Sequence, residues 1–517
     1  MIRCPNLLWR GLVGMAALVG SAAMATPNAL PAGELPATVR TALNRAQLPA
    51  DALVAYITEL GPPGPPRGLP RLTHRAQQPV NPASLMKLYT TGTALELLGP
   101  AWTWPTPVLT TGQLVDGVLQ GDLIIQGRGD PTLVIERLWL LLREVRQRGI
   151  HEVRGDIVLD GSAFVLNGAD AGDPADFDGE RFRPYNVRPD ALLLNHKSIT
   201  LRFVPEPSRG VARVSTDVNL AGVQIDSAVP LVSGGCGDWR GSLKPAFDEP
   251  GRIRLTGLFP VSCGEKIWPV AYAEPSSYNV RLIAESWHEL GGQLAGSVRN
   301  GPTPHGALPL FEATSPPLAA VVRDINKFSN NVMAQQLFLS LGLIPAGALP
   351  LPASAASAAT AAASDAATPP APAGSTADAA RELLRAQVRS RAGCTDSEFS
   401  IDNGSGLSRQ SRSSARCLGA WLQALWASPV MPELMSSLPL TGIDGTARRP
   451  GRDWGAALGR AHLKTGSLRD SMGLAGYVLG QSGRRYAFVA IVNHPSAGAA
   501  RPVLDALVQW AADDAER

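Results

Sequence analysis

The amino-acid sequence predicts an α+β protein in which a large β-rich segment is inserted into a helix-containing domain. Apolar residues recur at helical spacing on both sides of residues 101–300, for example in PPLAAVVRDINKF from residue 316. Residues 101–300 instead hold short strand-like runs that glycine and proline separate. At 517 residues and 45% hydrophobic content, the chain is long enough for two to four domains.

The helix-containing domain begins with residues 36–100. They hold a helical pattern in ATVRTALNRAQL, an apolar strand-like run in ALVAYITEL and a turn in GPPGPPRGLP. A second helical pattern follows in LMKLYTTGTALELLG, where Asn81 is a good N-cap and Pro82 suits the first turn. We therefore expect this helix to start within a residue or two of Ser84.

The predicted insertion, residues 101–300, contains two runs that resemble one another. GDLIIQG at 121–127 and GDIVLDG at 155–161 flank the helical pattern DPTLVIERLWLLLREVRQRG. Both runs have the apolar residues and the glycine boundaries of short strands. We expect one or more β-rich domains here.

Helical periodicity returns after residue 300, in PPLAAVVRDINKFSNNVMAQQLFLSLG. Alanine, proline and serine then dominate residues 344–378, which predicts a flexible surface loop because large apolar side chains are missing. From residue 379 onward, helical patterns such as ARCLGAWLQALWAS alternate with the strand patterns LAGYVLG and RRYAFVAIVNH.

Residues 1–25 have the features of a secretory signal peptide: a basic start, an apolar centre and a small-residue end, AMA. We expect cleavage before Thr26 and export of the mature protein to the periplasm. An uncleaved anchor is the alternative, but the apolar stretch is shorter than the roughly 20 residues that a membrane-spanning helix needs. We expect no transmembrane anchor after cleavage.

The net charge argues against one class of partner, and the spacing of the cysteines and histidines argues against a metal site. The formal charge of +3 falls to +1 when Arg3 and Arg10 leave with the signal peptide, which argues against a nucleic-acid partner. The histidines are scattered, and neither C-x-x-C nor H-E-x-x-H occurs, so we expect no metal site.

Four cysteines remain after cleavage of the predicted signal peptide. They form two neighbouring pairs in the sequence, Cys236 with Cys263 and Cys394 with Cys417. An even count in an oxidising compartment indicates disulfides, although four cysteines allow three connectivities.

Ser84 and Lys87 are three positions apart, so they share one face of the expected helix. A serine hydroxyl needs a neighbouring base, and a lysine can serve when burial or nearby cations lower its pKa. A helix N-terminus adds partial positive charge where an oxyanion forms. The chain has six lysines, and this is the one Ser-x-x-Lys pair, although such a pair is also an ordinary first turn.

A second candidate for substrate binding is Lys464-Thr465-Gly466, directly before a predicted strand. The lysine and the threonine can supply a cation and a hydroxyl for a substrate carboxylate, and the glycine permits close approach. Taken alone, such a triplet is as often a turn.

A third candidate pairs a hydroxyl and an amide, Ser329 and Asn331, at the start of a helical pattern. Both side chains can face a cleft at this spacing, where one relays a proton and the other binds a carbonyl. Helix capping is the structural alternative, because serine and asparagine are favoured there. Ser277 and Asn279 form a rival pair that also precedes a helical pattern.

The ordered set Ser-x-x-Lys, Ser-x-Asn, Lys-Thr-Gly resembles the penicillin-recognising serine enzymes, the penicillin-binding proteins and serine β-lactamases. Ser84 and Ser329 lie 245 residues apart, which is similar to the low-molecular-mass class C penicillin-binding proteins, D-alanyl-D-alanine carboxypeptidase/endopeptidases with domains inserted between these motifs. The resemblance runs from about residue 40 to the C-terminus and favours Ser329 over Ser277. Further matching blocks are GRGDPTL, IVLDGSAF, NGSGLSR, SLPLTGIDGT and LKTGSL.

This resemblance implies a β-lactamase/transpeptidase-like domain, an antiparallel sheet flanked by helices, built from residues 26–100 and 301–517. Residues 101–300 are then the insertion between the first and second motifs. Asn330, where aspartate is frequent in relatives, is expected to point away from the site. The implied activity is cleavage between the terminal D-alanines of peptidoglycan stem peptides, with no cofactor and with β-lactams as inhibitors.

The resemblance also implies a role for each motif residue. Ser84 is the nucleophile, Lys87 its base, Ser329 a proton relay and Asn331 a ligand of the substrate amide. The substrate-binding residues are Lys464 and Thr465, for the substrate carboxylate, and Gly466 and Ser467, whose strand contributes an oxyanion-binding N–H.

Asp160 resembles an acidic residue that faces the free amine of the stem peptide in some relatives. A turn residue at the end of a strand is its structural alternative. Two other functions use parts of the same pattern: a serine β-lactamase, which would share all three motifs, and a non-catalytic peptidoglycan-binding module. The large insertion argues against the first, and the intact motifs argue against the second.

Overall fold

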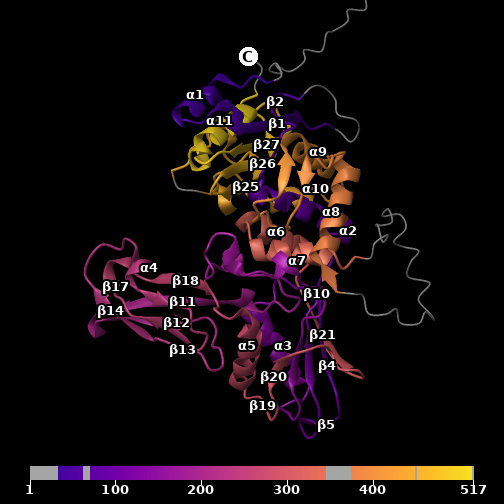
Figure 1. The fold of residues 1–517 in the computed structure, drawn as a ribbon, viewed down its shortest axis with the longest axis vertical. Coiled ribbons are helices and arrows are strands. Elements are labelled where there is room, and N and C mark those ends of the chain that lie inside the picture. Colours follow the sequence, from indigo (N-terminus) through magenta and orange to yellow (C-terminus); the bar gives the residue numbers. More distant parts are fainter. Residues whose placement is uncertain (1–32, 62–69, 345–373, 449–450, 515–517) are drawn as a thin grey trace, which may run out of the picture.

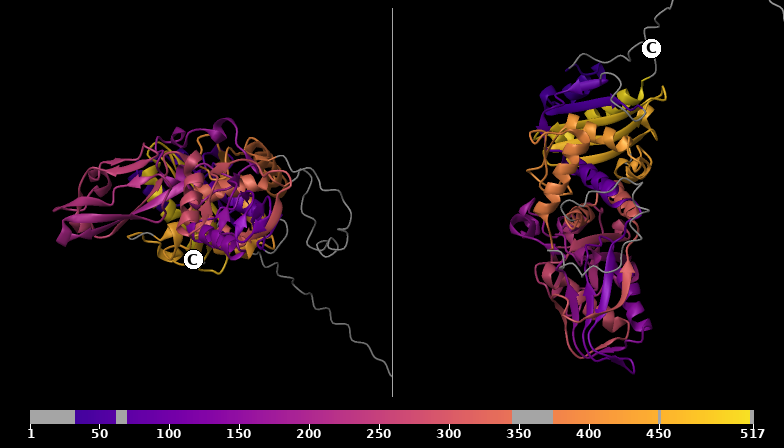
Figure 2. Two further views of the ribbon diagram at one scale, coloured as in Figure 1. Left: turned by 90° about the horizontal axis from the view of Figure 1, so that it is seen from below. Right: turned by 90° about the vertical axis from the view of Figure 1, so that its right-hand side faces the viewer.

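The computed structural model describes residues 33–61, 70–344, 374–448 and 451–514. The predicted signal peptide and most of the Ala/Pro-rich segment, residues 345–373, lie outside these ranges. The molecule is elongated: α1 (Ala37–Arg45) and α11 (Arg501–Ala512) lie in one half, and the inserted part forms the other half (Figures 1 and 2). None of the helices in the described ranges has the length and apolar character needed to cross a membrane.

A five-stranded antiparallel sheet is the centre of the first half. Its strands run in the order β2-β1-β27-β26-β25. The apolar runs expected to form strands are β1, β26 and β27, which are buried over most of their length. The bounds are β1 Leu53–Glu59, β2 Leu72–His74, β25 Ala461–Leu468, β26 Ser471–Leu479 and β27 Arg485–Asn493.

Helices cover both faces of this sheet, which explains the near-continuous apolar sequence of its strands. Within β27, Phe488 and Val492 belong to the core under α1 (Ala37–Arg45) and α11 (Arg501–Ala512). Val489 and Ile491 face the opposite core, because successive side chains alternate between the faces. That second core packs against α2 Lys87–Leu98, α6 Leu318–Phe328, α7 Asn331–Leu341, α8 Ala377–Ala392, α9 Ala415–Trp426 and α10 Met431–Ser437.

The inserted part closes on itself through its first and last strands. β4 (Pro105–Thr110) pairs antiparallel with β21 (Leu308–Thr314), so the insertion extends to residue 314 rather than to residue 300 as expected. The two similar sequence runs become β7 (Leu123–Gln126) and β9 (Ile157–Asp160), which are parallel and joined by α3 (Ile135–Gln147). β20 (Val298–Asn300) completes the sheet, in the order β20-β9-β7-β4-β21.

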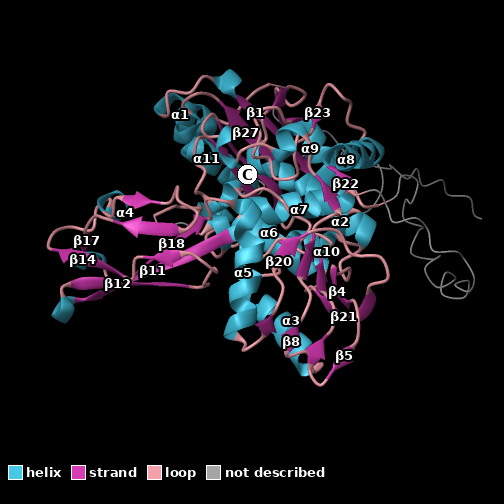
Figure 3. Ribbon diagram, turned by 60° about the horizontal axis from the view of Figure 1, so that its bottom comes forward, coloured by secondary structure: helices cyan, strands magenta, loops and turns pink. Residues whose placement is uncertain are grey.

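A second sheet of the insertion projects sideways from the body, on the left in Figures 1 and 3. Its strand order is β17-β14-β12-β11-β18, and the disulfide Cys236–Cys263 ties its outer end, as the sequence pairing suggested. Helix α5 (Pro275–Glu289) leads the chain back to the body. The bounds are β11 Ser198–Glu206, β12 Val211–Thr216, β14 Ala228–Val232, β17 Phe259–Pro260 and β18 Lys266–Ala271.

The C-terminal edge of the Ala/Pro-rich segment is regular structure rather than loop. Ser375–Thr376 forms β22, which pairs in parallel with β10 (Phe164–Val165) of the inserted part. The Thr376 hydroxyl accepts a hydrogen bond from Ala379 N at 3.2 Å and so caps α8. Our prediction of a loop up to residue 378 therefore extended a few residues too far.

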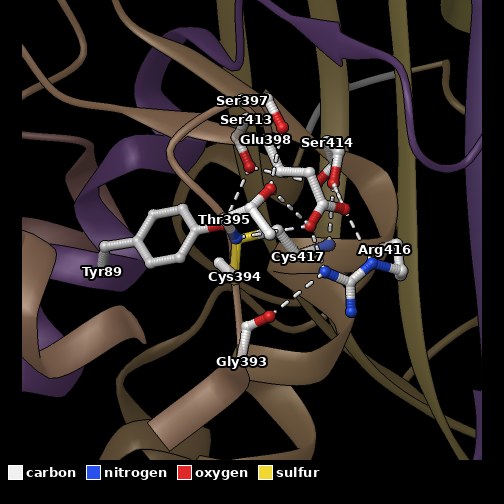
Figure 4. The surroundings of a disulfide bond; sticks show 10 residues. All are labelled: Tyr89, Gly393, Cys394, Thr395, Ser397, Glu398, Ser413, Ser414, Arg416 and Cys417. Carbon is white, nitrogen blue, oxygen red and sulfur yellow. Dashed lines mark hydrogen bonds and ion pairs between the residues drawn. A yellow bond between two sulfur atoms is a disulfide. The ribbon is translucent and has the colours of Figure 1, made fainter. Parts of the chain in front are cut away.

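The second disulfide, Cys394–Cys417, joins the end of α8 to the start of α9 beside the helix that follows Ser84 (Figure 4). Tyr89 of α2 donates a hydrogen bond to Cys417 Sγ at 3.3 Å and shares one with Ser413 Oγ at 2.8 Å. Both cysteines are buried. The disulfide is thus part of the packing that fixes α2.

Removal of this disulfide by Cys394→Ala with Cys417→Ala should lower the free energy of unfolding by about 3 kcal/mol, because a bond across 23 residues restricts the unfolded chain by about that amount. Denaturant unfolding followed by tryptophan fluorescence measures the change. Cys236→Ala with Cys263→Ala removes a bond across 27 residues in the projecting part, and the same argument predicts a loss of similar size. A denaturation midpoint equal to that of the wild type would contradict this prediction.

Candidate active site

Ser84 lies on a tight turn that precedes α2. The residues from Ala83 to Met86 form a single 3-10 turn, and the α-helix itself begins at Lys87. Ala83 has a φ of +50° and donates its N–H to Asn81 Oδ1 at 2.9 Å, so Asn81 fixes the entry into the turn. Side chains three positions apart eclipse one another in a 3-10 turn, and Lys87 Nζ lies 3.1 Å from Ser84 Oγ.

Lys87 is completely buried and has three oxygen neighbours. Besides Ser84 Oγ, its Nζ contacts Asn331 Oδ1 at 2.7 Å and the Ser405 carbonyl at 2.6 Å. Burial, and secondarily the charge of Lys464, lower the pKa of Lys87 well below its usual value. A neutral amine can donate to Asn331 and Ser405 while its lone pair faces the Ser84 hydroxyl. This is the geometry of a general base.

The second motif lies where α6 ends and α7 begins. Ser329 has a φ of +57° and ends α6, and the Asn330 side chain accepts a hydrogen bond from Met333 N and caps α7. Asn330 therefore points away from the site, as expected. The break directs the two flanking side chains inward: Asn331 reaches Lys87, and Ser329 Oγ accepts from Lys464 Nζ at 2.8 Å.

The third motif is part of β25, at the edge of the central sheet. Lys464 is completely buried, and burial lowers its pKa to about 7. Thr465 donates a hydrogen bond to Thr446 Oγ1 at 2.8 Å. A Cβ at Gly466 would lie 2.9 Å from the Pro82 carbonyl, so glycine is required for β25 to approach the Ser84 turn.

The three motifs thus meet in one hydrogen-bonded site, which the rival pair does not join. Asn279 lies in α5 of the inserted part and donates to the Leu192 carbonyl at 2.7 Å. Ser277 donates to Glu274. Neither bonds to a motif residue within the described ranges.

Two residues near the motifs had no assigned role in the sequence analysis. Ser405 provides the carbonyl that accepts from Lys87, and its Gly-Ser-Gly block packs on the nucleophile turn: Gly406, at a φ of +76°, stands against the Ala83 carbonyl. Tyr185 of the inserted part accepts from Asn331 Nδ2 at 3.5 Å through its carbonyl. The Gly-Ser-Gly pattern was visible in the sequence, whereas no local signal marked Tyr185.

Asp160 occupies a different place, at the end of β9. Its carboxylate accepts hydrogen bonds from Ser162 N, Gln126 Nε2 and both Thr303 N and Thr303 Oγ1. It lines a cavity in the inserted part that includes none of the three motifs. That Asp160 faces the free amine of a stem peptide remains a prediction.

Comparison with known proteins identifies the family of this chain. The family model described as D-Ala-D-Ala carboxypeptidase 3 (S13) matches residues 67–365 and 371–514. The chain belongs to this family. The D-alanyl-D-alanine carboxypeptidase DacB of Haemophilus influenzae is 23% identical over 80% of this chain and 81% of its own length. The D-alanyl-D-alanine carboxypeptidase of an Actinomadura species is 28% identical over 82% of this chain and 76% of its own.

Solved structures confirm the fold. Penicillin binding protein 4 from H. influenzae matches with a TM-score of 0.70 and 19% identity, covering 91% of this chain and 98% of that one. Its complex with a β-lactam matches with a TM-score of 0.63 and 20% identity, covering 88% of this chain and 93% of that one. The predicted transpeptidase-like fold and the predicted class of serine-type D-Ala-D-Ala peptidase are therefore confirmed. The roles of individual residues remain predictions.

The two buried lysines predict a bell-shaped pH dependence of kcat/KM. We expect the acid limb to report Lys87, which must be neutral to act as the predicted base. We expect the alkaline limb to report Lys464, whose pKa is about 7 and whose charge is predicted to attract the substrate carboxylate. Lys464→Gln removes a charge that lowers the pKa of Lys87. That pKa should rise, so the acid limb should move to higher pH and the alkaline limb should disappear.

Stopped-flow acylation across pH measures both limbs. Thr465→Val is the control, because it removes a hydroxyl beside Lys464 without removing charge, and it should leave the acid limb in place. An acid limb that stays unchanged in Lys464→Gln would contradict the coupling of the two lysines.

Proposed function

We propose that this protein is a periplasmic D-alanyl-D-alanine carboxypeptidase/endopeptidase that cleaves peptidoglycan stem peptides through an acyl-enzyme on Ser84, and that β-lactams inhibit it. The observation that carries the proposal is the environment of Lys87. Its Nζ lies 3.1 Å from Ser84 Oγ while two further oxygens, from Asn331 and Ser405, take up its remaining N–H groups.

The acylation step follows from this arrangement. Ser84 Oγ attacks the carbonyl carbon between the two D-alanines, and Lys87 takes the hydroxyl proton. The negative charge that develops on the carbonyl oxygen is stabilised by the backbone N–H groups of Ser84 and Ser467. The C–N bond then breaks as a proton passes through the Ser329 hydroxyl to the leaving amine.

The other motif residues hold the substrate. The Asn331 side chain, at the cleft end of α7, binds the substrate amide. Lys464 and Thr465 bind the terminal carboxylate by a charge-assisted hydrogen bond and a hydroxyl contact. Gly466 permits the substrate backbone to lie along β25. The Lys464 charge disfavours a second cation nearby and so also keeps Lys87 neutral.

Hydrolysis of the acyl-enzyme completes the reaction. Water attacks the ester carbonyl, and Ser84 leaves with a proton, which restores the free enzyme. A β-lactam opens its ring on Ser84 in the same way, but its amine stays attached to the acyl group, so the ester persists and blocks the site.

Product analysis with defined muropeptides tests this function. The purified mature chain should release one D-alanine from a stem pentapeptide, and it should split a cross-linked dimer into monomers. Ser277→Ala, which changes the rival serine, should behave like the wild type. Release of no D-alanine and cleavage of no dimer would contradict the proposal.

A further inference from the structure

The segment from the end of α10 to Thr446 lies against the third motif, although the reaction described above gives it no role. It is the block SLPLTGIDGT, residues 437–446, which the sequence analysis singled out. Its last residue, Thr446, is half-buried, and its Oγ1 lies 2.8 Å from Thr465 Oγ1. This is the one hydrogen bond of the Thr446 side chain among the described residues. A motif hydroxyl is therefore paired with a second hydroxyl whose own proton is free.

A buried ion pair fixes the position of this segment. Lys327 is 5% exposed, and its Nζ donates to Asp444 Oδ2 at 2.6 Å. Gly445, at a φ of +53°, stands against the Lys327 carbonyl, where a Cβ would lie 2.6 Å away. Lys327 is two positions before Ser329 at the end of α6. The chain segment that supplies Ser329 to the site therefore also holds Thr446 in place.

The lysine of the third motif has one N–H group left for a substrate. A lysine ammonium has three donors, and Lys464 Nζ donates to Ser329 Oγ at 2.8 Å and to the Thr465 carbonyl at 2.7 Å. A carboxylate accepts several hydrogen bonds through its two oxygens. The Thr465 hydroxyl is the next donor in this motif, but in the structure it donates to Thr446. When it turns to a carboxylate, its oxygen keeps lone pairs that can accept the Thr446 proton.

We propose that Thr446 is a positioning residue for the terminal carboxylate of the substrate. As the carboxylate binds, the Thr465 hydroxyl donates to one of its oxygens, and the Thr446 hydroxyl donates to Thr465 Oγ1. A hydroxyl that accepts one hydrogen bond while it donates another is polarised, so it binds the anion more strongly. The inference rests on the proposed function and deepens it: two linked hydroxyls select a leaving residue with a free α-carboxylate.

Steady-state kinetics on two peptides test this role. One is an N-acylated D-alanyl-D-alanine peptide with a free carboxylate, and the other is its C-terminal amide. Thr446→Val should lower kcat/KM for the free carboxylate about tenfold, mainly through KM, because it weakens a hydrogen bond to a charged group. For the amide, kcat/KM should change by less than about twofold, because an amide carries no charge for the hydroxyls to stabilise.

Two further variants distinguish positioning from packing. Thr446→Ser keeps the hydroxyl and should restore the wild-type preference for the free carboxylate. Because Thr446 acts through Thr465, adding Thr446→Val to Thr465→Val should cause no further loss. Thr41→Val, at an exposed position of α1, is the matched control for the loss of a threonine hydroxyl. If Thr446→Val melts at a lower temperature than Thr41→Val, Thr446→Ala replaces it with the same expectation.

Three results would overturn the inference. The first is wild-type kinetics of Thr446→Val on the free carboxylate. The second is an equal loss on both peptides, which would indicate a structural role. The third is a full further loss in the double variant, which would mean that Thr446 acts independently of Thr465. A wild type that cleaves neither peptide would overturn the proposed function, and this inference with it.

Discussion

Ser84→Ala should lower the rate of D-alanine release by at least about 10⁴-fold, because no other group can form the acyl-enzyme. Ser84 lies 3.1 Å from the buried amine of Lys87, on a turn that Asn81 and Gly406 hold in place. The fold should be unaffected, since the substitution removes one oxygen. Coupled detection of D-alanine from a stem pentapeptide measures the loss.

The control for Ser84→Ala is Ser277→Ala, because the Ser277 hydroxyl donates to Glu274, the residue before α5, and bonds to no motif residue among the described residues. The two variants should unfold at the same temperature as the wild type. Their rates of D-alanine release should differ by at least about 10⁴-fold. Substantial activity in Ser84→Ala would assign the chemistry to another group and contradict the mechanism.

Lys87→Gln should lower the rate of acylation by about 10³-fold, within the range that a positioned general base contributes. Glutamine keeps a polar group that can donate to Asn331 and Ser405, but it cannot accept the Ser84 proton. The acid limb of the pH profile should disappear with the lysine, because burial and Lys464 lower the pKa of that one amine. Acylation by a fluorescent penicillin, followed over time and across pH, measures both effects.

Lys244→Gln is the matched control for the loss of a lysine, because that side chain is exposed in the inserted part, between Ser242 and Pro245. It should acylate at the wild-type rate. An acid limb that persists in Lys87→Gln would mean that a different group removes the proton from Ser84, which would contradict the assigned base even if the rate fell.

The parts of the fold that the sequence predicted are those with strong local periodicity. Sequence patterns alone predicted the strands β1, β26 and β27 and the helix α9, because each of these elements is buried along most of its length or along one face. The break between α6 and α7 was not visible in the periodicity of residues 316–342, although a helix start near Ser329 was one interpretation of the second motif. It depends on the left-handed backbone of Ser329 and the cap by Asn330, which periodicity does not encode.

The candidate site shows the same division between local and distant signals. The three motifs are short and local, so they could be found in order along the chain. The contacts of Lys87 with Ser405 and of Asn331 with Tyr185 join residues 318 and 146 positions apart, and only the folded chain brings these groups together. Asp160 was chosen from its local block, and in the structure it lines a cavity of the inserted part whose walls include no motif residue.

The central claim is that Ser84 is an acylated nucleophile, and intact-protein mass spectrometry after incubation with benzylpenicillin tests it most directly. The wild type should gain the mass of one benzylpenicilloyl group, peptide mapping should place it on the segment that contains Ser84, and Ser84→Ala should gain none. An unmodified wild type with the penicillin intact, or an adduct that persists in Ser84→Ala, would contradict this account.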